Sequence, residues 1–129
     1  MPERPLNRIC YVEDDEDIQR IVRMSLERVG KMTVEVVGDP TMAIEAINAF
    51  KPDLVMLDWM MPKIDGPALF RQMQARPDTQ GLPVVFMTAK ASQRDLDELM
   101  KMGAVATISK PFDPKELPAQ LREIWRKLP

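Results

Sequence analysis

LVMLDWMMPKIDG, residues 54–66, is an apolar run that ends at Asp58 and then enters a Pro/Gly turn. A short apolar run bounded by turn residues is typical of a strand buried on both faces, as in a parallel sheet covered by helices. Asp58 is then expected at the carboxyl end of that strand. In open α/β sheets, ligands bind at this edge because the connecting loops leave a crevice there.

Four more strands and five helices are expected around this run. The predicted strands are residues 8–12, 33–37, 83–88 and 104–108, and the predicted helices are residues 18–29, 40–49, 66–75, 93–102 and 114–128. Gly30 and Gly103 are expected to end helices, and Asp39 and Asp113, each followed by proline, to begin them. Strands and helices that alternate through short connections form a parallel sheet. The sequence therefore predicts an α/β fold with a five-stranded parallel sheet covered on both faces.

The helices are expected to bury their apolar stripes in the core of the domain. Ile21 and Val29 belong to the stripe of the first helix, and Met100 belongs to that of the fourth. Pro118 lies at the fifth position of the last helix, where it lacks the backbone N–H that an α-helix needs. The first turn of that helix is therefore expected to depart from α-helical geometry.

Length and charge limit the classes of function that are expected. A chain of 129 residues suits one domain, and we expect residues 1–129 to form a single domain with its core at 8–128. The formal net charge is −2, with basic and acidic residues interspersed, so direct binding to nucleic acid is not expected. The sequence has no signal peptide and no apolar stretch of ~20 residues, which favours a cytoplasmic protein without membrane contact.

The residue types in the chain also exclude several catalytic sites. There is no histidine, which excludes a Ser-His-Asp triad, a Cys-His dyad and a His-ligated zinc site. The single cysteine, Cys10, lies in an apolar run and is expected to be a small core residue. Any chemistry must therefore rely on carboxylates, hydroxyls and lysine.

Polar residues follow the predicted strands at one edge of the sheet. At the carboxyl ends of the strands stand Glu13 and Asp14 for the first, Asp58 for the third, Thr88 and Ala89 for the fourth, and Lys110 for the fifth. Clustered carboxylates repel each other unless a cation lies among them, and oxygen ligands alone suit a hard ion such as Mg²⁺. We expect Asp14 and Asp58 to bind Mg²⁺ directly and Glu13 to bind it through water. The hydroxyl of Thr88, the N–H of Ala89 and the ammonium of Lys110 suit phosphate oxygens.

This pattern closely resembles the receiver domains of two-component response regulators, over essentially all of residues 8–128. The resemblance rests on VEDD at 12–15, LDWMMPKIDG at 57–66, TA at 88–89 and SKPF at 109–112. It implies a flavodoxin-like, doubly wound (βα)5 fold with the strand order 2-1-3-4-5. We expect a stand-alone receiver, similar to the single-domain chemotaxis regulators, without an output domain. The family also holds the peptide that corresponds to Lys110-Pro111 in the cis form.

Receiver domains accept a phosphoryl group from a sensor histidine kinase or a histidine phosphotransfer protein. The resemblance makes Asp58 the nucleophile, and it makes Thr88 and Lys110 the groups that stabilise developing charge. It also makes the backbone carbonyl of Met60 a further ligand of Mg²⁺. The chain is thus not expected to be an enzyme beyond its own phosphorylation and slow autodephosphorylation. We expect a monomer or weak dimer that acts on a downstream protein through the surface of helix 4, strand 5 and helix 5.

The sequence departs from the family at the switch and beside the acceptor. Thr107 stands where the family has an aromatic residue that rotates during signalling, which argues against the usual switch and against the dimer mode of DNA-binding members. In the family, the side chains two residues beyond the acceptor and two beyond the switch hydroxyl screen the phosphoryl group from water. Here they are Met60 and Lys90. Because Met60 cannot orient a water molecule, we expect slow self-dephosphorylation.

Two other functions fit parts of the pattern. A small phosphohydrolase can use an aspartate such as Asp58 as a transient nucleophile, but haloacid-dehalogenase-like enzymes need a second Asp where this chain has Met60. A pseudo-receiver acts as a phosphorylation-independent interaction module, and this function predicts the loss of pocket residues, none of which is missing here. Multiple turnover of a phosphomonoester would favour the first alternative, and absence of phosphorylation would favour the second.

Overall fold

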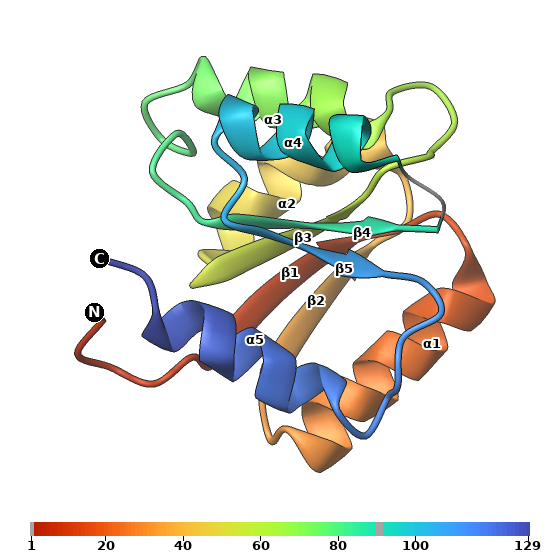
Figure 1. Cartoon of the computed structure of the whole chain (residues 1–129), viewed down its shortest axis with the longest axis vertical. Helices are drawn as coiled ribbons and strands as arrows, with labels where there is room; N and C mark the ends of the chain where they lie inside the picture. Colours follow the sequence, from red (N-terminus) through yellow and green to blue (C-terminus); the bar gives the residue numbers. More distant parts are fainter. Residues whose placement is uncertain (1, 90–91) are drawn as a thin grey trace.

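Strands and helices alternate along the chain (Figure 1). The computed structural model describes residues 2–89 and 92–129, so Lys90 lies outside the described residues. The strands are β1 Arg8–Val12, β2 Thr33–Val37, β3 Leu54–Asp58, β4 Val84–Thr88 and β5 Ala106–Ser109. The helices are α1 Glu16–Met24, α2 Ala43–Phe50, α3 Gly66–Gln74, α4 Gln93–Met102 and α5 Leu117–Arg126, with a π-helical segment η1 Ser25–Val29 and a 3₁₀ turn η2 Pro40–Met42.

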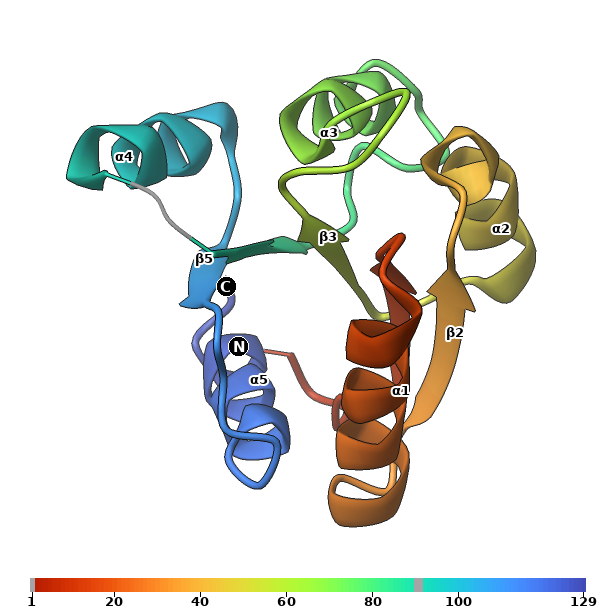
Figure 2. The same cartoon turned by 90° about the vertical axis from the view of Figure 1, so that its right-hand side faces the viewer.

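The strands form one parallel sheet in the order β2-β1-β3-β4-β5. Helices α1 and α5 cover one face of the sheet, and α2, α3 and α4 cover the other (Figures 1 and 2). Every residue of β3 and β4 is buried, as expected for central strands covered on both faces. The predicted doubly wound α/β fold and its strand order are confirmed. Within the described residues, none of the helices combines the length and the apolar character needed to cross a bilayer.

Alternation along the strands divides the core into two clusters. The buried strand residues on the α1 and α5 side are Ile9, Tyr11, Val34, Leu54, Met56, Val85, Met87 and Ile108. Those on the side of α2, α3 and α4 are Cys10, Val12, Val37, Val55, Leu57, Val84 and Phe86. Because successive side chains of a strand lie on opposite faces, Glu13 and Asp58 continue the first series and Thr88 continues the second.

The first helix differs from its prediction. It continues beyond Met24 as the wider π-helical η1, whose last hydrogen bond runs from Gly30 N to Ser25 O at 3.0 Å. Ile21 and Val29 are 45% and 55% exposed, so their predicted burial is wrong. For Val29 the reason is geometric, because it lies within the π-helical turn, where side chains point in other directions than they would in an α-helix.

The last helix begins three residues later than predicted. Residues 114–116 form a turn, and α5 starts at Leu117, because Pro118 has no N–H to donate to the carbonyl of Pro114. That carbonyl instead accepts a hydrogen bond from Ser25 Oγ, which links the start of α5 to η1. The predicted irregular first turn is therefore confirmed.

Two smaller differences concern α4 and β5. The strand starts at Ala106 rather than at Ala104, because the N–H of Ala104 donates to Leu99 O at the end of α4. Gly103 ends the helix with φ 115°, a left-handed conformation that favours glycine, as predicted. Leu99 is buried, but Met100 is 47% exposed, which corrects its predicted inward position.

Candidate functional site

The predicted acids and the lysine meet at the carboxyl edge of the sheet. β1 and β3 are neighbours with Val12 opposite Leu57, so the residues that follow these positions, Glu13 and Asp58, lie side by side. The hollow at this edge has a volume of about 310 Å³ and is lined by Glu13, Asp14, Asp15, Ile18, Asp58, Trp59, Met60, Ala89 and Lys110. Residues that are far apart in the sequence are thus brought together as the sheet topology requires.

Lys110 joins the two buried carboxylates of this hollow. Its Nζ donates to Asp58 Oδ1 at 2.6 Å and to Glu13 Oε1 at 2.8 Å. Glu13 and Asp58 are 1% and 6% exposed. The Lys110-Pro111 peptide bond is cis, as expected from the resemblance. The backbone N–H of Lys110 donates to Thr88 O at 2.6 Å, which fixes the end of β5 against β4.

The environment shifts the pKa of both partners of this ion pair. Burial raises the pKa of Asp58 from 3.8 to about 6; the hydrogen bond from Lys110 opposes this shift, and the charge of Glu13 adds to it. Burial acts to lower the pKa of Lys110, but its hydrogen bonds to Asp58 and Glu13 outweigh burial and raise the pKa overall. Lys110 is therefore a permanent cation, whereas Asp58 takes up a proton at weakly acidic pH.

Three of the four acids that line the hollow form a candidate metal site. Glu13, Asp14 and Asp58 each offer a carboxylate oxygen, and these oxygens lie within 4.8 Å of one another. Asp14 is exposed at the mouth of the site. A set of oxygen ligands matches Mg²⁺, and the single charge of Lys110 offsets only part of the negative charge of three carboxylates. The residues fit the Mg²⁺ ion that the sequence predicts.

The predicted phosphoryl contacts occupy different places. Ala89 lines the hollow, as does Met60, the predicted carbonyl ligand of Mg²⁺, whose side chain is 78% exposed. Thr88 is buried, and it is not among the described residues that line the hollow. The reason is the strand alternation: Val84 and Phe86, which precede Thr88 at alternate positions, pack on the side of α2, α3 and α4. A contact between Thr88 and a phosphoryl group therefore requires a change of position.

Gly66 allows α3 to begin directly beside the proposed acceptor. A Cβ at this position would lie 2.5 Å from Asp58 O and 3.1 Å from Trp59 Cα. The N–H of Gly66 donates to Trp59 O at 2.8 Å, and Asp65 caps the helix by accepting from the N–H of Ala68 at 2.8 Å. The Pro/Gly turn predicted after Asp58 thus folds back against the strand and fixes the backbone of the site.

Three residues that support the site were not predicted from the sequence. Glu13 accepts hydrogen bonds at Oε1 from the Tyr11 hydroxyl (2.7 Å), at Oε2 from Asp15 N (3.3 Å) and at its backbone carbonyl from Gln19 Nε2 (2.5 Å). Tyr11 had a signal in the sequence, because residues two apart on a strand share a face and Tyr11 stands two positions before Glu13. The contact between Gln19 of α1 and the Glu13 carbonyl has no comparable signal in the sequence.

An apolar groove adjoins the acidic hollow. It has a volume of about 500 Å³ and is lined by Ile18, Ile21, Ala89, Lys110, Pro111, Phe112 and Pro114. Ile18, Ala89 and Lys110 line both the groove and the hollow, so the two are continuous. The exposed Ile21 gives this surface an apolar residue from α1. An apolar surface therefore lies directly beside Asp58.

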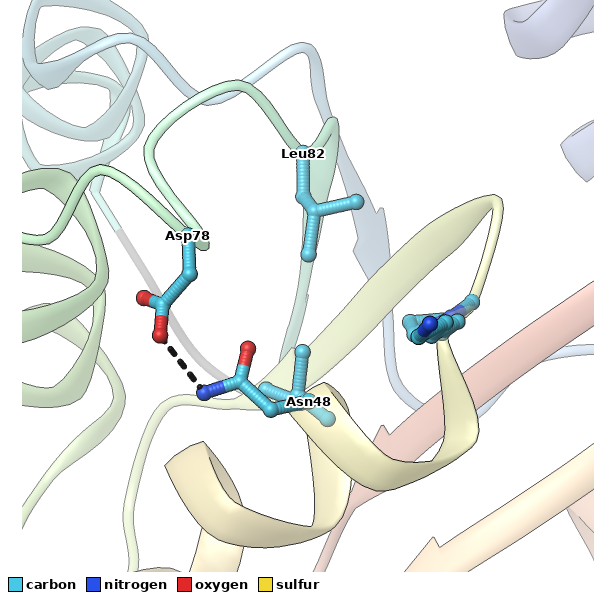
Figure 3. A pocket seen from close by; sticks show the side chains of 6 residues that line it. Asn48, Asp78 and Leu82 are labelled. Carbon is cyan, nitrogen blue, oxygen red and sulfur yellow. Dashed lines mark hydrogen bonds between the residues drawn. The ribbon is translucent and has the colours of Figure 1, made fainter.

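A separate hollow of about 460 Å³ lies near the amino ends of β3 and β4, opposite the carboxyl edge of the sheet. It is lined by Ile47, Asn48, Lys51, Pro52, Asp78 and Leu82. Figure 3 shows Asn48 and Asp78 pointing toward each other, with Asn48 Nδ2 donating to Asp78 Oδ2 at 2.9 Å. Asp78 also forms an ion pair with Arg76 at 3.0 Å. These polar groups are engaged with one another, and the contacts stabilise the approach of α2 to the loop before β4.

Comparison with known proteins connects this chain with one family. The family model of the response regulator receiver domain matches residues 9–122. The phosphate regulon transcriptional regulatory protein PhoB of Escherichia coli K12 is 36% identical over 121 residues, which are 94% of this chain and 52% of PhoB. The DNA-binding response regulator MtrA of Mycobacterium tuberculosis is 38% identical over 120 residues, which are 93% of this chain and 51% of MtrA. The chain spans about half the length of these relatives.

The likeness extends to solved structures. The receiver domain of the Francisella response regulator 1452 superposes with a TM-score of 0.82 and 26% sequence identity. The superposition covers 96% of this chain and 98% of that domain. The similarity therefore includes the whole sheet and the helices on both of its faces.

Proposed function

This chain belongs to the response regulator receiver domain family, and we propose that it is a phospho-accepting switch of a two-component or phosphorelay system. In the proposed reaction, a phosphohistidine of a sensor histidine kinase or of a histidine phosphotransfer protein gives its phosphoryl group to Asp58. The observation that carries this proposal is the contact of Lys110 Nζ with Asp58 Oδ1 at 2.6 Å, in a hollow that Glu13 and Asp14 also line.

The proposed transfer uses the ionised carboxylate of Asp58. One of its oxygens forms a bond to phosphorus while the bond from phosphorus to the donor imidazole breaks, and the imidazole leaves with the electron pair. Lys110 donates to oxygen atoms that gain negative charge during the transfer. When bound by Asp14, by Asp58, by the Met60 carbonyl and, through water, by Glu13, Mg²⁺ supplies charge that offsets the phosphoryl oxygens.

Two groups at the end of β4, one in the last residue of the strand and one in the residue after it, are proposed to contact the phosphoryl group after transfer. The N–H of Ala89 donates to it, and the hydroxyl of Thr88 moves toward it. Movement of Thr88 shifts the end of β5, because Thr88 O accepts a hydrogen bond from the backbone N–H of Lys110, the residue that follows this strand. We propose that the response reaches the surface of α4, β5 and α5, where a downstream protein binds. Thr107 of β5 takes part without an aromatic ring to rotate.

The apolar groove is the proposed contact surface of the phosphodonor. It adjoins the hollow that contains Asp58, and Ile21 and Phe112 give it an apolar surface on both sides. Ile21→Glu is expected to slow transfer from a histidine phosphotransfer protein at least tenfold and to leave transfer from acetyl phosphate unchanged. Met42→Glu is the matched control, because Met42 is 50% exposed and is not among the described residues that line the groove.

The test of the proposed function is incorporation of a phosphoryl group from acetyl phosphate, followed by intact mass spectrometry. The wild-type chain is expected to gain one phosphoryl group when Mg²⁺ is present. The Asp58→Asn chain is expected to gain none, because its amide is not a nucleophile. Incorporation that does not depend on Asp58 would exclude it as the acceptor.

A further inference from the structure

The buried hydroxyl of Tyr11 is hydrogen-bonded to Glu13, one of the acids of the hollow. Tyr11 itself is not among the described residues that line the hollow. The side chain is fully buried in β1, and its hydroxyl donates to Glu13 Oε1 at 2.7 Å. Lys110 Nζ donates to the same oxygen at 2.8 Å. The second oxygen, Oε2, receives only the longer contact of 3.3 Å from Asp15 N among the hydrogen bonds of the described residues. The two oxygens of the Glu13 carboxylate are therefore in different environments.

The position of the Tyr11 hydroxyl is fixed by the sheet. β1 is a central strand, and Tyr11 lies between Val36 of β2 and Met56 of β3. Its ring belongs to the core cluster beneath α1 and α5, which leaves the side chain little freedom. Burial, followed by the charge of Glu13, raises the pKa of Tyr11, so the hydroxyl keeps its proton and acts as a donor.

Glu13 needs such a fixed partner because its carboxylate ends a flexible side chain. Burial alone does not select one orientation of the carboxylate, whereas two donors on one oxygen do. With Oε1 held by Tyr11 and Lys110, Oε2 is the oxygen that would remain to hold a water molecule of a cation bound by Asp14 and Asp58. The same arrangement gives the buried Tyr11 hydroxyl the partner that it requires.

We propose that Tyr11 is a positioning residue of the cation site, which acts by holding Glu13 Oε1 so that Oε2 faces the ion. This inference rests on the proposed function, because it takes the acidic cluster as the Mg²⁺ site. Tyr11 does not touch the ion, and its effect passes entirely through Glu13. Partners of this kind, which orient the ligands of a metal, typically change metal affinity when they are removed.

The experiment is a Mg²⁺ titration followed by the fluorescence of Trp59, which lines the hollow, in the absence of any phosphodonor. Four chains are compared: wild type, Tyr11→Phe, Glu13→Asp and the double variant. Tyr11→Phe is expected to weaken Mg²⁺ binding about tenfold. In the Glu13→Asp background, the same substitution is expected to change the affinity less than twofold, because the shorter side chain ends too far from the Tyr11 hydroxyl.

Each result either supports or overturns the inference. Equal Mg²⁺ affinity of wild type and Tyr11→Phe overturns it and leaves the proposed function standing. The inference is also overturned if Tyr11→Phe weakens Mg²⁺ binding by the same factor in the wild-type chain and in the Glu13→Asp chain. Such an effect would arise from packing in general and would not pass through Glu13. No Mg²⁺ binding by the folded wild-type chain overturns the proposed metal site and this inference together. Urea unfolding in EDTA shows that all four chains are folded before the titration.

Discussion

Lys110 Nζ lies 2.6 Å from Asp58 Oδ1, although the two residues are 52 positions apart in the sequence. The ammonium group thus contacts a carboxylate whose pKa is raised to about 6 by burial. The hydrogen bond from Lys110 does not restore an ordinary pKa, because burial outweighs it and the negative charge of the neighbouring Glu13 adds to the effect of burial. The unfavourable burial of charge at this edge of the sheet is therefore expected to affect the free energy of unfolding.

The first consequence concerns stability in the absence of a divalent ion. The pKa of Asp58 is about 6 in the folded chain and 3.8 as its ordinary value, so the folded state binds this proton more tightly. Protonation therefore favours folding: the contribution is fully present below pH ~4 and is lost as the pH rises through about 6. Asp58→Asn, which removes the charge, is expected to increase the free energy of unfolding at pH 7 by up to about 3 kcal/mol.

Urea titrations of both chains in EDTA, at pH 4 and at pH 7, measure this difference. Asp58→Asn is expected to increase the free energy of unfolding at pH 7. The increase should be small at pH 4, where Asp58 of the wild type is largely protonated. A gain of equal size at both pH values would show that the effect arises from packing and not from ionisation.

Mg²⁺ is expected to stabilise the folded chain through the acidic cluster. At a concentration ten times its dissociation constant, an ion that binds only the folded state adds about 1.4 kcal/mol to the free energy of unfolding. Asp14→Asn should abolish this gain, because Asp14 is a proposed direct ligand. Asp17→Asn is the control, since Asp17 is also exposed but lies outside the acidic cluster. Urea unfolding with and without Mg²⁺ measures the gain, and equal gains in the two variants would argue against the site.

Met60 is expected to give the phosphorylated chain a long lifetime. Its side chain is 78% exposed at the mouth of the hollow and has no strong donor or acceptor to orient a water molecule for attack on phosphorus. Met60→Asn supplies an amide there, and the phosphorylated chain should lose its phosphoryl group severalfold faster. The decay of the phosphorylated mass after removal of the donor measures this rate. An unchanged decay would show that Met60 does not control the access of water.

Gly30 is expected to be essential for the junction between η1 and α5. Its φ of −83° suits any residue, so the constraint is steric: a Cβ would lie 2.8 Å from Leu26 O and 2.9 Å from Pro118 Cβ. Gly30→Ala should reduce the free energy of unfolding by about 1–3 kcal/mol. Gly81→Ala is the matched control, because a Cβ there would meet nothing within 4 Å among the described residues. Urea midpoints that fall equally in both variants would contradict the steric explanation.

The sequence predicted the sheet well because its strands are short apolar runs with turn residues on both sides. β1, β2 and β3 have the predicted bounds, and the residues at their carboxyl ends meet as the topology requires. The site was predictable for the same reason, since parallel strands bring the ends of distant segments to one edge. Lys110 could thus be assigned to the neighbourhood of Asp58 before any distance was known.

The parts that escaped prediction depend on contacts between helices. The π-helical turn of η1 coincides with the bond from Ser25 Oγ to the free carbonyl of Pro114, which periodicity does not reveal. Ile21 lines the apolar groove together with Phe112 and Pro114 of the loop before α5, and it is 45% exposed there. Within the sheet, the hydrogen bond from Tyr11 to Glu13 was missed although the two residues share a face of β1, because an apolar strand with one tyrosine is typical of an ordinary core.

The most direct test of the central claim is the intact mass of the chain after incubation with acetyl phosphate, with Trp59 fluorescence recorded in the same samples. Wild type and Asp58→Asn are each treated with Mg²⁺ and with EDTA. We expect a gain of one phosphoryl group in the wild type with Mg²⁺ and none in the other three samples. If Mg²⁺ quenches Trp59 but no donor adds a phosphoryl group, or if Asp58→Asn gains one equally well, Asp58 is not the acceptor and the proposed function is wrong.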